Sequence, residues 1–595
     1  MQRFDDNKNI RTYKDSVVIK RLLHYAGKVK WYFIGALFIT ALLVAVDLMP
    51  AYLEGELIGA LQDANKTNNE KITFAVILLA IFAVVIVGSS FLNYFNSMML
   101  QKAGQKIVLT IRREVFVKIE GLAIAQVNAT PVGKLVTRVT SDVNMVNELY
   151  TNVIVNLIRY ILTIIFVLIM MIIISPTLTL YILCIIPILI VMSIVFNKVS
   201  RRQYRKVRGC VSNVNAFLSE NLSGMKITQI FNQEEKKQKE FRVKNNDLRK
   251  NSIKEIVIFG IFRPAIYVLY VTCHIIILFN GFNLVLAGML ESKNLVKFYQ
   301  YNGQFFNPIQ QLADQFNQLQ SAFASSERIF EILDTKTQIL DGDDCIEIDH
   351  FEGKIEFDHV WFAYNDENWI LKDVSFVIEP KQTVAFVGAT GAGKTTILAL
   401  IVRNYEIQKG TIRIDGVDVK KIKLESLRKH IGQMLQDVFL FSGTIKSNIT
   451  MRDDSFTNEE IVEACKYVNA SHFIEKLDKG YESEVLQRGN NFSSGERQLL
   501  SFARTILHKP NIMILDEATA NIDTETEVLI QDSLEKMMNV GTMLIVAHRL
   551  STVQHADNII VLHKGEIVEM GNHQQLLSKR GLYYNLYELQ YKNME

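Results

Sequence analysis

Cysteine and proline are scarce in this sequence, which has 5 cysteines and 8 prolines in 595 residues. No pair of cysteines has the CxxC or zinc-finger spacing that a structural metal site needs. We therefore expect neither a disulfide framework nor a structural metal site, and the scattered cysteines suit a reducing compartment. So few prolines, together with 30 glycines, also exclude a collagen-like chain.

A large excess of one charge is also missing, because 65 Lys and Arg residues face 62 Asp and Glu residues. The formal net charge of +3 argues against a protein that coats nucleic acid, so no nucleic-acid partner is expected. The polar residues 1–16 have no apolar core or small-residue cleavage site and predict no cleaved secretory signal. The mean hydropathy of +0.14 is what an apolar half averaged with a polar half gives.

Long apolar runs occupy the first half of the chain. The first run, 31–53, has about 23 residues, and as a helix of ~35 Å it is long enough to cross a hydrocarbon layer of ~30 Å. Comparable runs follow, the last of them weaker. The sequence therefore predicts six membrane-spanning helices, at 31–53, 72–95, 153–174, 177–197, 257–286 and 296–320.

The loops between these runs differ in charge. Segments 101–148 and 198–255 are rich in Lys and Arg, whereas the other loops have few basic residues. By the positive-inside rule, the two long loops and both termini are expected in the cytoplasm. Loops of this length are expected to be helical extensions of the spans. Residues 14–30 fit either a basic amphipathic helix on the inner membrane surface or a plain surface helix.

Several polar residues interrupt the apolar runs: Asp47, Arg159, Arg263, His274 and Asp314, with a series of amides along 300–318. Charges are costly in lipid, so such residues usually face the interior of a bundle or an aqueous cavity. They therefore predict a polar-lined pathway along the sixth span. The alternative is that they lie at the headgroup level or on cytoplasmic extensions, where they cost little.

After Glu331 the pattern changes to short apolar strands and amphipathic helices, which indicate a soluble α/β domain. A strand at 383–387 is followed by a glycine-rich loop and a helix, the context of a P-loop. The loop residues are Gly388, Ala389, Thr390, Gly391, Ala392, Gly393, Lys394, Thr395 and Thr396. Backbone N–H groups of such a loop bind phosphate oxygens, Lys394 can bridge the β and γ phosphates of ATP, and Thr395 can hold Mg²⁺.

A second motif lies about 120 residues further on. There an apolar strand delivers Asp516 and Glu517 to its carboxyl end, where ligands collect in a parallel sheet. Asp516 can bind the water shell of Mg²⁺, and Glu517 can polarise an attacking water. Alone this pattern is weak, but together with the P-loop it predicts a nucleotide-hydrolysing site.

Further motifs follow in a fixed order: Tyr364 in VWFAY, Gln436 in QMLQDVFLF, the segment FSSGE, ANID with Asp523, and His548 in VAHRLS. Together with the P-loop they resemble the ATP-binding cassette family over essentially the whole chain, specifically bacterial exporters with six spans and one nucleotide-binding domain. The resemblance implies that Tyr364 stacks on adenine, Gln436 belongs to the Q-loop and contacts the metal, and His548 is the switch histidine. It also implies that Ser493, Ser494, Gly495, Glu496 and Asp523 contact nucleotide, with the signature segment closing on the γ-phosphate held by a second cassette.

The signature departs from the usual LSGGQ of the family, because Ser494 replaces a glycine and Glu496 a glutamine. A side chain at 494 and an acid at 496 are expected to crowd and repel a γ-phosphate. The residues of the P-loop, Asp516 and Glu517 are intact, so the chain resembles the subunit of a heterodimeric exporter that supplies the catalytic glutamate. The alternative is a homodimer that tolerates a variant signature.

These patterns predict a membrane α-helical bundle fused to an α/β P-loop nucleotide-binding domain. We expect an N-terminal segment with an amphipathic helix at 1–30, a transmembrane domain at 31–325, a linker at 326–352 and a nucleotide-binding domain at 353–595. The resemblance implies an ATP-driven, Mg²⁺-dependent exporter of amphipathic drugs, peptides or lipids in the bilayer of a bacterial cytoplasmic membrane, paired with a second half-transporter chain. A nucleotide-gated or regulatory membrane subunit is the competing function.

Overall fold

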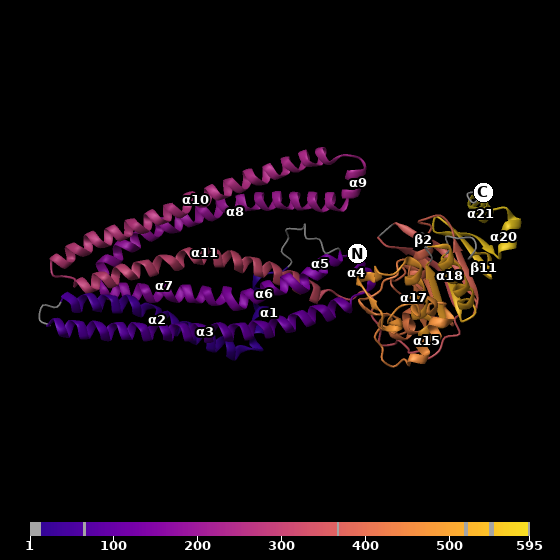
Figure 1. Ribbon diagram of the computed structural model, residues 1–595, viewed down its shortest axis with the longest axis horizontal. Coiled ribbons are helices and arrows are strands. Elements are labelled where there is room, and N and C mark those ends of the chain that lie inside the picture. Colours follow the sequence, from indigo (N-terminus) through magenta and orange to yellow (C-terminus); the bar gives the residue numbers. More distant parts are fainter. Residues whose placement is uncertain (1–12, 63–66, 366–367, 517–521, 547–552, 593–595) are drawn as a thin grey trace. The chain divides into compact units, whose positions relative to one another are not determined.

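The computed structural model describes residues 13–62, 67–365, 368–516, 522–546 and 553–592 (Figure 1). The chain divides into two compact units, which we describe separately. One contains Asp5–Glu120 and Gly133–Thr335, and the other contains Gly121–Val132 and Lys336–Glu595. The predicted boundaries at 30, 325 and 352 stay predictions.

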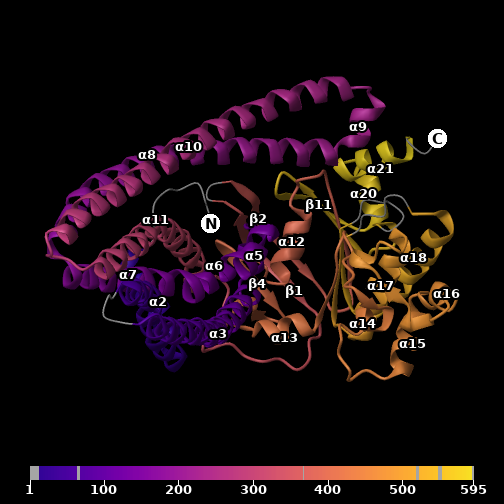
Figure 2. The ribbon, with the colours of Figure 1, turned by 60° about the vertical axis from the view of Figure 1, so that its left-hand side comes forward.

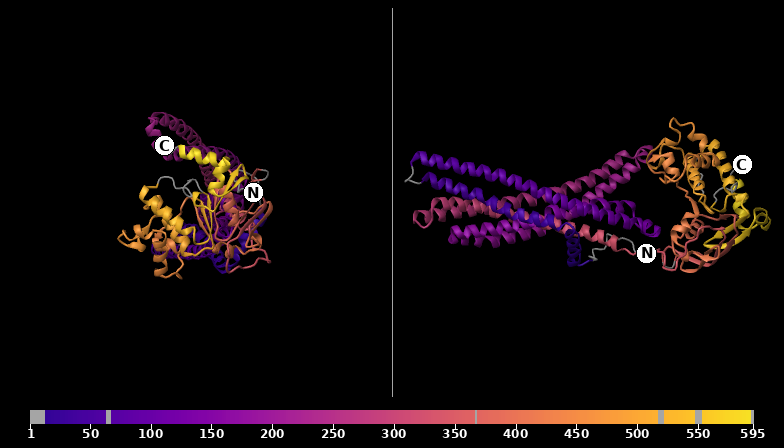
Figure 3. Two further views of the ribbon diagram at one scale, coloured as in Figure 1. Left: turned by 90° about the vertical axis from the view of Figure 1, so that its right-hand side faces the viewer. Right: turned by 90° about the horizontal axis from the view of Figure 1, so that it is seen from below.

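The first unit consists of helices, several of them very long (Figures 1 and 3). Their bounds are α1 Asp15–Gly27, α2 Lys30–Gln62, α3 Asn68–Glu120, α5 Val132–Thr137, α6 Val143–Glu148, α7 Ile154–Ile174, α8 Pro176–Ser223, α9 Met225–Ile230, α10 Glu234–Leu286 and α11 Ser292–Asp334, with π-helical turns at Arg138–Asp142 and Leu149–Val153. Helix α2 packs along α3, α8 along α10, and α11 along both α7 and α2. Both basic loops are mostly helical, as predicted, because α3, α8 and α10 continue well beyond their apolar stretches.

Within the described residues, five helical segments are long and apolar enough to cross a membrane. They are Lys30–Gln62, Asn68–Glu120, Val132–Ile174, Pro176–Ser223 and Glu234–Leu286. Each contains one of the first five predicted spans. The sixth, 296–320, lies within the continuous helix α11, whose amides lower its hydropathy. Its membrane crossing stays a prediction.

A core of fully buried side chains joins these helices at the level of α11. Phe298, Tyr301 and Phe306 of α11 pack there with Met171 of α7 and Cys273 of α10. Spacings of three and five residues put the three aromatic rings on neighbouring faces of α11, and burying rings of this size stabilises the helix in its place. Helix α11 is therefore the element around which α2, α7, α8 and α10 gather.

The second unit contains two main sheets and a short strand pair. A four-stranded antiparallel sheet has the order β2-β1-β4-β5, and a six-stranded sheet has the order β12-β11-β3-β10-β9-β6. Strands β11, β3, β10, β9 and β6 are parallel neighbours, and β12 is antiparallel. The strand bounds are β1 Ile355–Ala363, β2 Trp369–Ile378, β3 Thr383–Val387, β4 Lys409–Ile414, β5 Val417–Asp418, β6 Ile431–Met434, β7 Gly443–Thr444, β8 Glu484–Val485, β9 Ile512–Asp516, β10 Thr542–Val546, β11 Asn558–His563 and β12 Glu566–Gly571.

Helices cover the six-stranded sheet. Their bounds are α12 Lys394–Ile401, α13 Leu424–Lys429, α14 Ile445–Ile449, α15 Asn458–Tyr467, α16 Ser471–Ile474, α17 Ser494–Leu507, α18 Thr524–Met537, α20 His573–Lys579 and α21 Leu582–Lys592, and the small helix α4 Ile124–Asn128 belongs to the same unit. Helices α14, α15 and α18 pack against α17 (Figure 2). Strands β3, β9 and β10 are buried over almost their whole length, which explains their continuous apolar sequences.

Candidate functional site

The P-loop lies between the buried strand β3 and helix α12, in the context that the sequence predicts. Gly393 has φ +104°, and a Cβ atom there would come within 2.6 Å of Leu371 Cδ2 on β2. A Cβ at Gly388, whose φ is also positive, would collide with the carbonyl oxygen of Leu562 on β11. Only glycine fits at these two positions, so the glycines of the motif let the loop pack closely against two strands.

Lys394 is buried within this loop. Its Nζ donates hydrogen bonds to the carbonyl oxygens of Gly388 at 2.7 Å and Ala389 at 3.2 Å. Burial lowers the pKa of Lys394, and the nearby Asp516 carboxylate opposes that shift. A desolvated ammonium group against backbone carbonyls, at the N-terminus of a helix, is well suited to an anion. The loop therefore fits the phosphates of ATP.

The sheet register brings the other predicted site residues to the same edge. Asp516, the last residue of β9, pairs with Val546 on β10, which pairs in turn with Phe386 on β3, just before the loop. Gln436 follows the end of β6 and is exposed. Because carboxyl ends of parallel strands share an edge, Asp516 and Gln436 lie on the side of the sheet from which the P-loop departs.

Magnesium at this edge would use oxygen ligands. The part of the chain that the structure describes contains no cluster of three or more His, Cys, Asp and Glu side chains with metal-site geometry. The exposed Thr395 hydroxyl, the Gln436 amide and Asp516 are hard oxygen donors of the kind Mg²⁺ prefers when nucleotide phosphates complete its shell. These residues fit Mg²⁺, and their contact with it stays a prediction. When bound, the ion supplies charge neutralisation at the phosphates.

Tyr364 follows β1 and is fixed at its hydroxyl. The Oη atom lies 3.1 Å from Thr396 Oγ1 of α12, and the ring packs edge-on against Tyr405. The Gln408 amide makes hydrogen bonds of 2.8 Å and 3.1 Å to the backbone of Ala363 and holds the preceding residue. The side chain remains 38% exposed, so part of the ring is open to a ligand beside the P-loop. Sequence reasoning missed Tyr405 and Gln408, since neither belongs to a motif.

The signature segment begins helix α17 and forms a capping box. Ser493 Oγ accepts the N–H of Glu496 at 3.2 Å, and Glu496 Oε2 accepts the N–H of Ser493 at 2.7 Å. Two backbone N–H groups at this helix start are thereby satisfied within the chain, and the carboxylate neutralises the positive end of the helix dipole. Ser494 is half-buried at the first helical position.

Gly495 joins the signature helix to α18. A Cβ atom there would collide with Thr526 Cγ2, so the close contact of α17 with α18 requires glycine. Asp523 has a structural role in the same region, because its Oδ2 caps α18 by accepting the N–H of Thr526 at 2.9 Å. That backbone hydrogen bond lowers the pKa of Asp523. The predicted contact of Asp523 with nucleotide stays a prediction. Glu517 and His548 lie outside the described residues.

Several of the polar residues that interrupt the apolar runs make contacts between helices. Arg159 donates to Asp47 at 2.7 Å between α7 and α2. His274 Nδ1 lies 3.0 Å from the carbonyl oxygen of Tyr270 and 3.1 Å from the Asn302 amide. The amides Gln300 and Gln304 donate to Glu54 and to the backbone of Asp47 on α2. These side chains face other helices of the bundle, and a polar pathway along the sixth span stays a prediction.

Two ion pairs, each with one buried partner, were missed by sequence reasoning. Arg328 near the end of α11 bonds Asp142 through both its Nε and Nη2 atoms, across a separation of 186 residues. Lys297 on α11 pairs with Glu56 on α2 at 2.6 Å, and the Lys297 side chain is 4% exposed. Nothing in the local sequence marks these partners.

The comparisons agree with this geometry. A family model described as ABC transporter transmembrane region matches residues 33–309, and one described as ABC transporter matches residues 371–520. A putative ABC transporter ATP-binding protein of Streptococcus pneumoniae is 35% identical over 96% of this chain and 97% of its own length. A probable multidrug resistance ABC transporter ATP-binding/permease protein of Bacillus subtilis is 36% identical over 87% of this chain and 77% of its own length. An ATP-dependent lipid A-core flippase of Syntrophus aciditrophicus is 33% identical over 84% of this chain and 83% of its own length.

Proposed function

We propose, from the premise that this chain belongs to the ABC transporters as a bacterial half-transporter exporter, that it is the catalytic-glutamate-bearing subunit of a heterodimer that exports amphipathic substrates. At the coarser level, the chain is a multi-pass membrane protein of the multidrug or lipid exporter type that couples ATP hydrolysis to transport. The finer proposal places it in the bacterial cytoplasmic membrane, with both termini in the cytoplasm.

The observation that carries the ATP-driven function is the buried Lys394 ammonium inside the P-loop, with Asp516 at the same sheet edge. Lys394 binds the β and γ phosphates, while Thr395, Asp516 and Gln436 hold Mg²⁺. Tyr364 stacks on the base. Glu517 polarises the attacking water, and His548 is the switch histidine.

The heterodimer rests on the signature segment. In a composite site, the N-terminus of α17 faces the γ-phosphate held by the partner's P-loop. Here the negative charge of the Glu496 carboxylate, which accepts the Ser493 N–H, cancels part of the helix dipole, so this end attracts a phosphate less than it would with the usual glutamine. The site formed with the partner's P-loop is therefore the weaker one. The site with this chain's own Lys394 and Glu517 turns over.

The experiment is ATPase measurement on the complex purified from the native host, with the accompanying chain identified. Lys394→Ala should abolish hydrolysis, because the phosphate-bridging cation is lost. Glu517→Gln should keep ATP binding and trap closed cassettes. Lys421→Ala, at a surface position on the same unit, is the matched control. Near-normal transport by Glu517→Gln would contradict its role, and a complex that binds ATP without hydrolysis would favour the regulatory alternative.

A further inference from the structure

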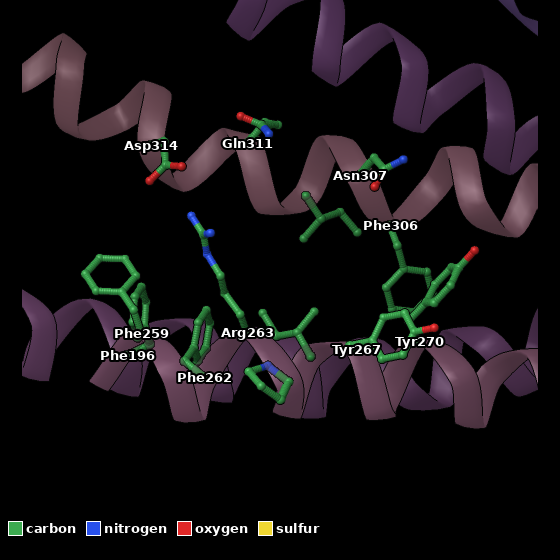
Figure 4. Close-up of a pocket in the computed structure, with 13 residues that line it drawn as sticks. Phe196, Phe259, Phe262, Arg263, Tyr267, Tyr270, Phe306, Asn307, Gln311 and Asp314 are labelled. Atoms are coloured by element: carbon green, nitrogen blue, oxygen red, sulfur yellow. The ribbon is translucent and has the colours of Figure 1, made fainter. Parts of the chain in front are cut away.

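The structure contains a cavity of about 770 Å³ between α8, α10 and α11, within the helical unit (Figure 4). This volume falls in the range of about 300–1,000 Å³ typical of pockets for drug-sized ligands. One part of its wall is aromatic: Phe196, Phe259, Phe262, Tyr267, Tyr270 and Phe306. An apolar body of a ligand would replace water against these rings, which favours its burial.

Two charges face this cavity. Arg263 extends from α10 and Asp314 from α11, and the two side chains point toward one another in Figure 4. Both lie in segments predicted to span the membrane, and both are exposed within the chain. Among the described residues, neither makes a hydrogen bond or ion pair, and Arg263 has only Phe259 beneath its guanidinium, 6.0 Å from the ring centre.

The other charges that interrupt the predicted spans are compensated. Asp47 and Arg159 pair at 2.7 Å, and Lys297 and Glu56 pair at 2.6 Å. A charge left without a partner at membrane depth is costly and marks a functional position. Arg263 and Asp314 therefore differ from the other charged residues of the predicted spans, and a ligand that carries an anionic and a cationic group can compensate both charges.

We propose that this cavity binds a zwitterionic amphiphile, whose anionic group contacts Arg263, whose cationic group contacts Asp314 and whose apolar part lies against the aromatic wall. The proposal rests on the proposed export function and narrows its substrate class. The guanidinium offers a planar fork of donors for a phosphate or carboxylate, and the carboxylate accepts from an ammonium group. Asn307 and Gln311, which also line the cavity, add hydrogen-bonding groups along α11 beside Asp314 (Figure 4). A phospholipid with an amino headgroup and an apolar peptide with free termini share this chemistry.

The test measures binding to the purified complex by native mass spectrometry, which does not depend on hydrolysis. The lipid probes are lysophosphatidylethanolamine, lysophosphatidic acid and an alkylammonium of the same chain length. The peptide probes are a leucine tetrapeptide with free termini and the same peptide with its amino or its carboxyl terminus blocked. The class that shows a preference for the zwitterion identifies the source of the ligand.

We expect the unchanged protein to bind the zwitterion of one class at least about tenfold more tightly than either singly charged analogue, the effect of one contact of about 1.4 kcal/mol. Arg263→Gln should remove the preference over the cationic analogue, and Asp314→Asn the preference over the anionic one. Arg263→Lys and Asp314→Glu, which keep the charges, should retain the preference. Arg249→Gln, at an exposed position of α10 outside the cavity, should change nothing.

A purely structural role for the two charges predicts equal weakening for all three analogues, and that result would overturn the proposal. Equal binding of zwitterion and singly charged analogues by the unchanged protein would overturn it too. Basal ATPase activity, measured in parallel, separates this failure from failure of the export function. If Lys394-dependent hydrolysis persists while the preference is missing, only the substrate class is wrong.

Discussion

The side chain of Tyr364 is fixed by its contacts and still leaves part of its ring exposed to a ligand. Its hydroxyl bonds Thr396 on the helix that follows the P-loop, its ring is perpendicular to the ring of Tyr405, and 38% of the side chain stays exposed. Burial raises the pKa of Tyr364, with the Thr396 hydroxyl opposing, so the phenol is neutral at physiological pH. A neutral ring that is held at its hydroxyl and partly exposed suits stacking on a purine.

We expect Tyr364→Ala to weaken ATP binding about tenfold, because base stacking on an aromatic ring contributes about 1–3 kcal/mol. Tyr364→Phe keeps the ring, loses the bond to Thr396 and should stay within about twofold of the unchanged protein. ATP titrations together with kcat and KM distinguish the two effects. The control is Tyr467→Ala, where the ring is also 38% exposed and bonds a backbone oxygen elsewhere. Lost turnover with unchanged affinity would contradict stacking.

Among the elements, the contact of α17 with α18 links the signature segment to the loop before Thr524. Gly495 makes it possible, because Thr526 Cγ2 occupies the space of a Cβ atom. Gly495→Ala should overpack this contact by about 1–3 kcal/mol and lower the Tm of the complex by several degrees. Thr526→Ser removes the obstructing methyl group, and the double variant should recover most of the loss.

Scanning fluorimetry of the four proteins measures this coupling. Gly209→Ala in α8 is the control, since nothing lies within 4 Å of a Cβ atom there and alanine favours a helix. An unchanged Tm for Gly495→Ala, or a double variant no more stable than the single, would show that α17 and α18 separate without cost.

Helices α2 and α11 are joined by charge as well as by packing. The buried Lys297 side chain forms an ion pair with Glu56, and its Nζ atom also lies 3.8 Å from the ring centre of Tyr52. Removing one partner of such a pair leaves the other unpaired, so Lys297→Met should lower the Tm by more than the double variant Lys297→Met with Glu56→Gln. Because Glu56 is 27% exposed, we expect a loss of about 1–3 kcal/mol rather than the larger loss of a fully buried pair. Equal Tm values for single and double variants would contradict the coupling.

For the whole molecule, the sequence predicts those features whose signals are continuous along the chain. Apolar runs located the long helices, and the strand-loop-helix pattern located the P-loop around Lys394. Pairings across the fold were not predictable, because Lys297 and Glu56 are 241 residues apart and each could have faced water. The same limit applied to Arg263 and Asp314, which the sequence marked as costly and only the fold brings to one cavity.

The departures in the signature have a consequence for the whole assembly. If the partner carries an LSGGQ-like loop and a weakened acid after its Asp516 equivalent, this chain's P-loop forms the hydrolysing site, and the other site holds ATP for many turnovers. Ser494→Gly with Glu496→Gln would relieve crowding and charge at that second site while keeping the capping box, since glutamine caps as glutamate does. It would not supply the partner's missing carboxylate.

Overall turnover in that double variant should therefore change only two- to threefold, less than ~1 kcal/mol of barrier. Restoring the acid in the partner should have little effect until this signature is also repaired, and both changes together should produce a second hydrolysing site. Steady-state ATPase and trapped-nucleotide stoichiometry for the single and combined variants measure this. An active homodimer of this chain with two equivalent hydrolysing sites would contradict the asymmetry, because Glu496 would then be present at both signatures without impairing either.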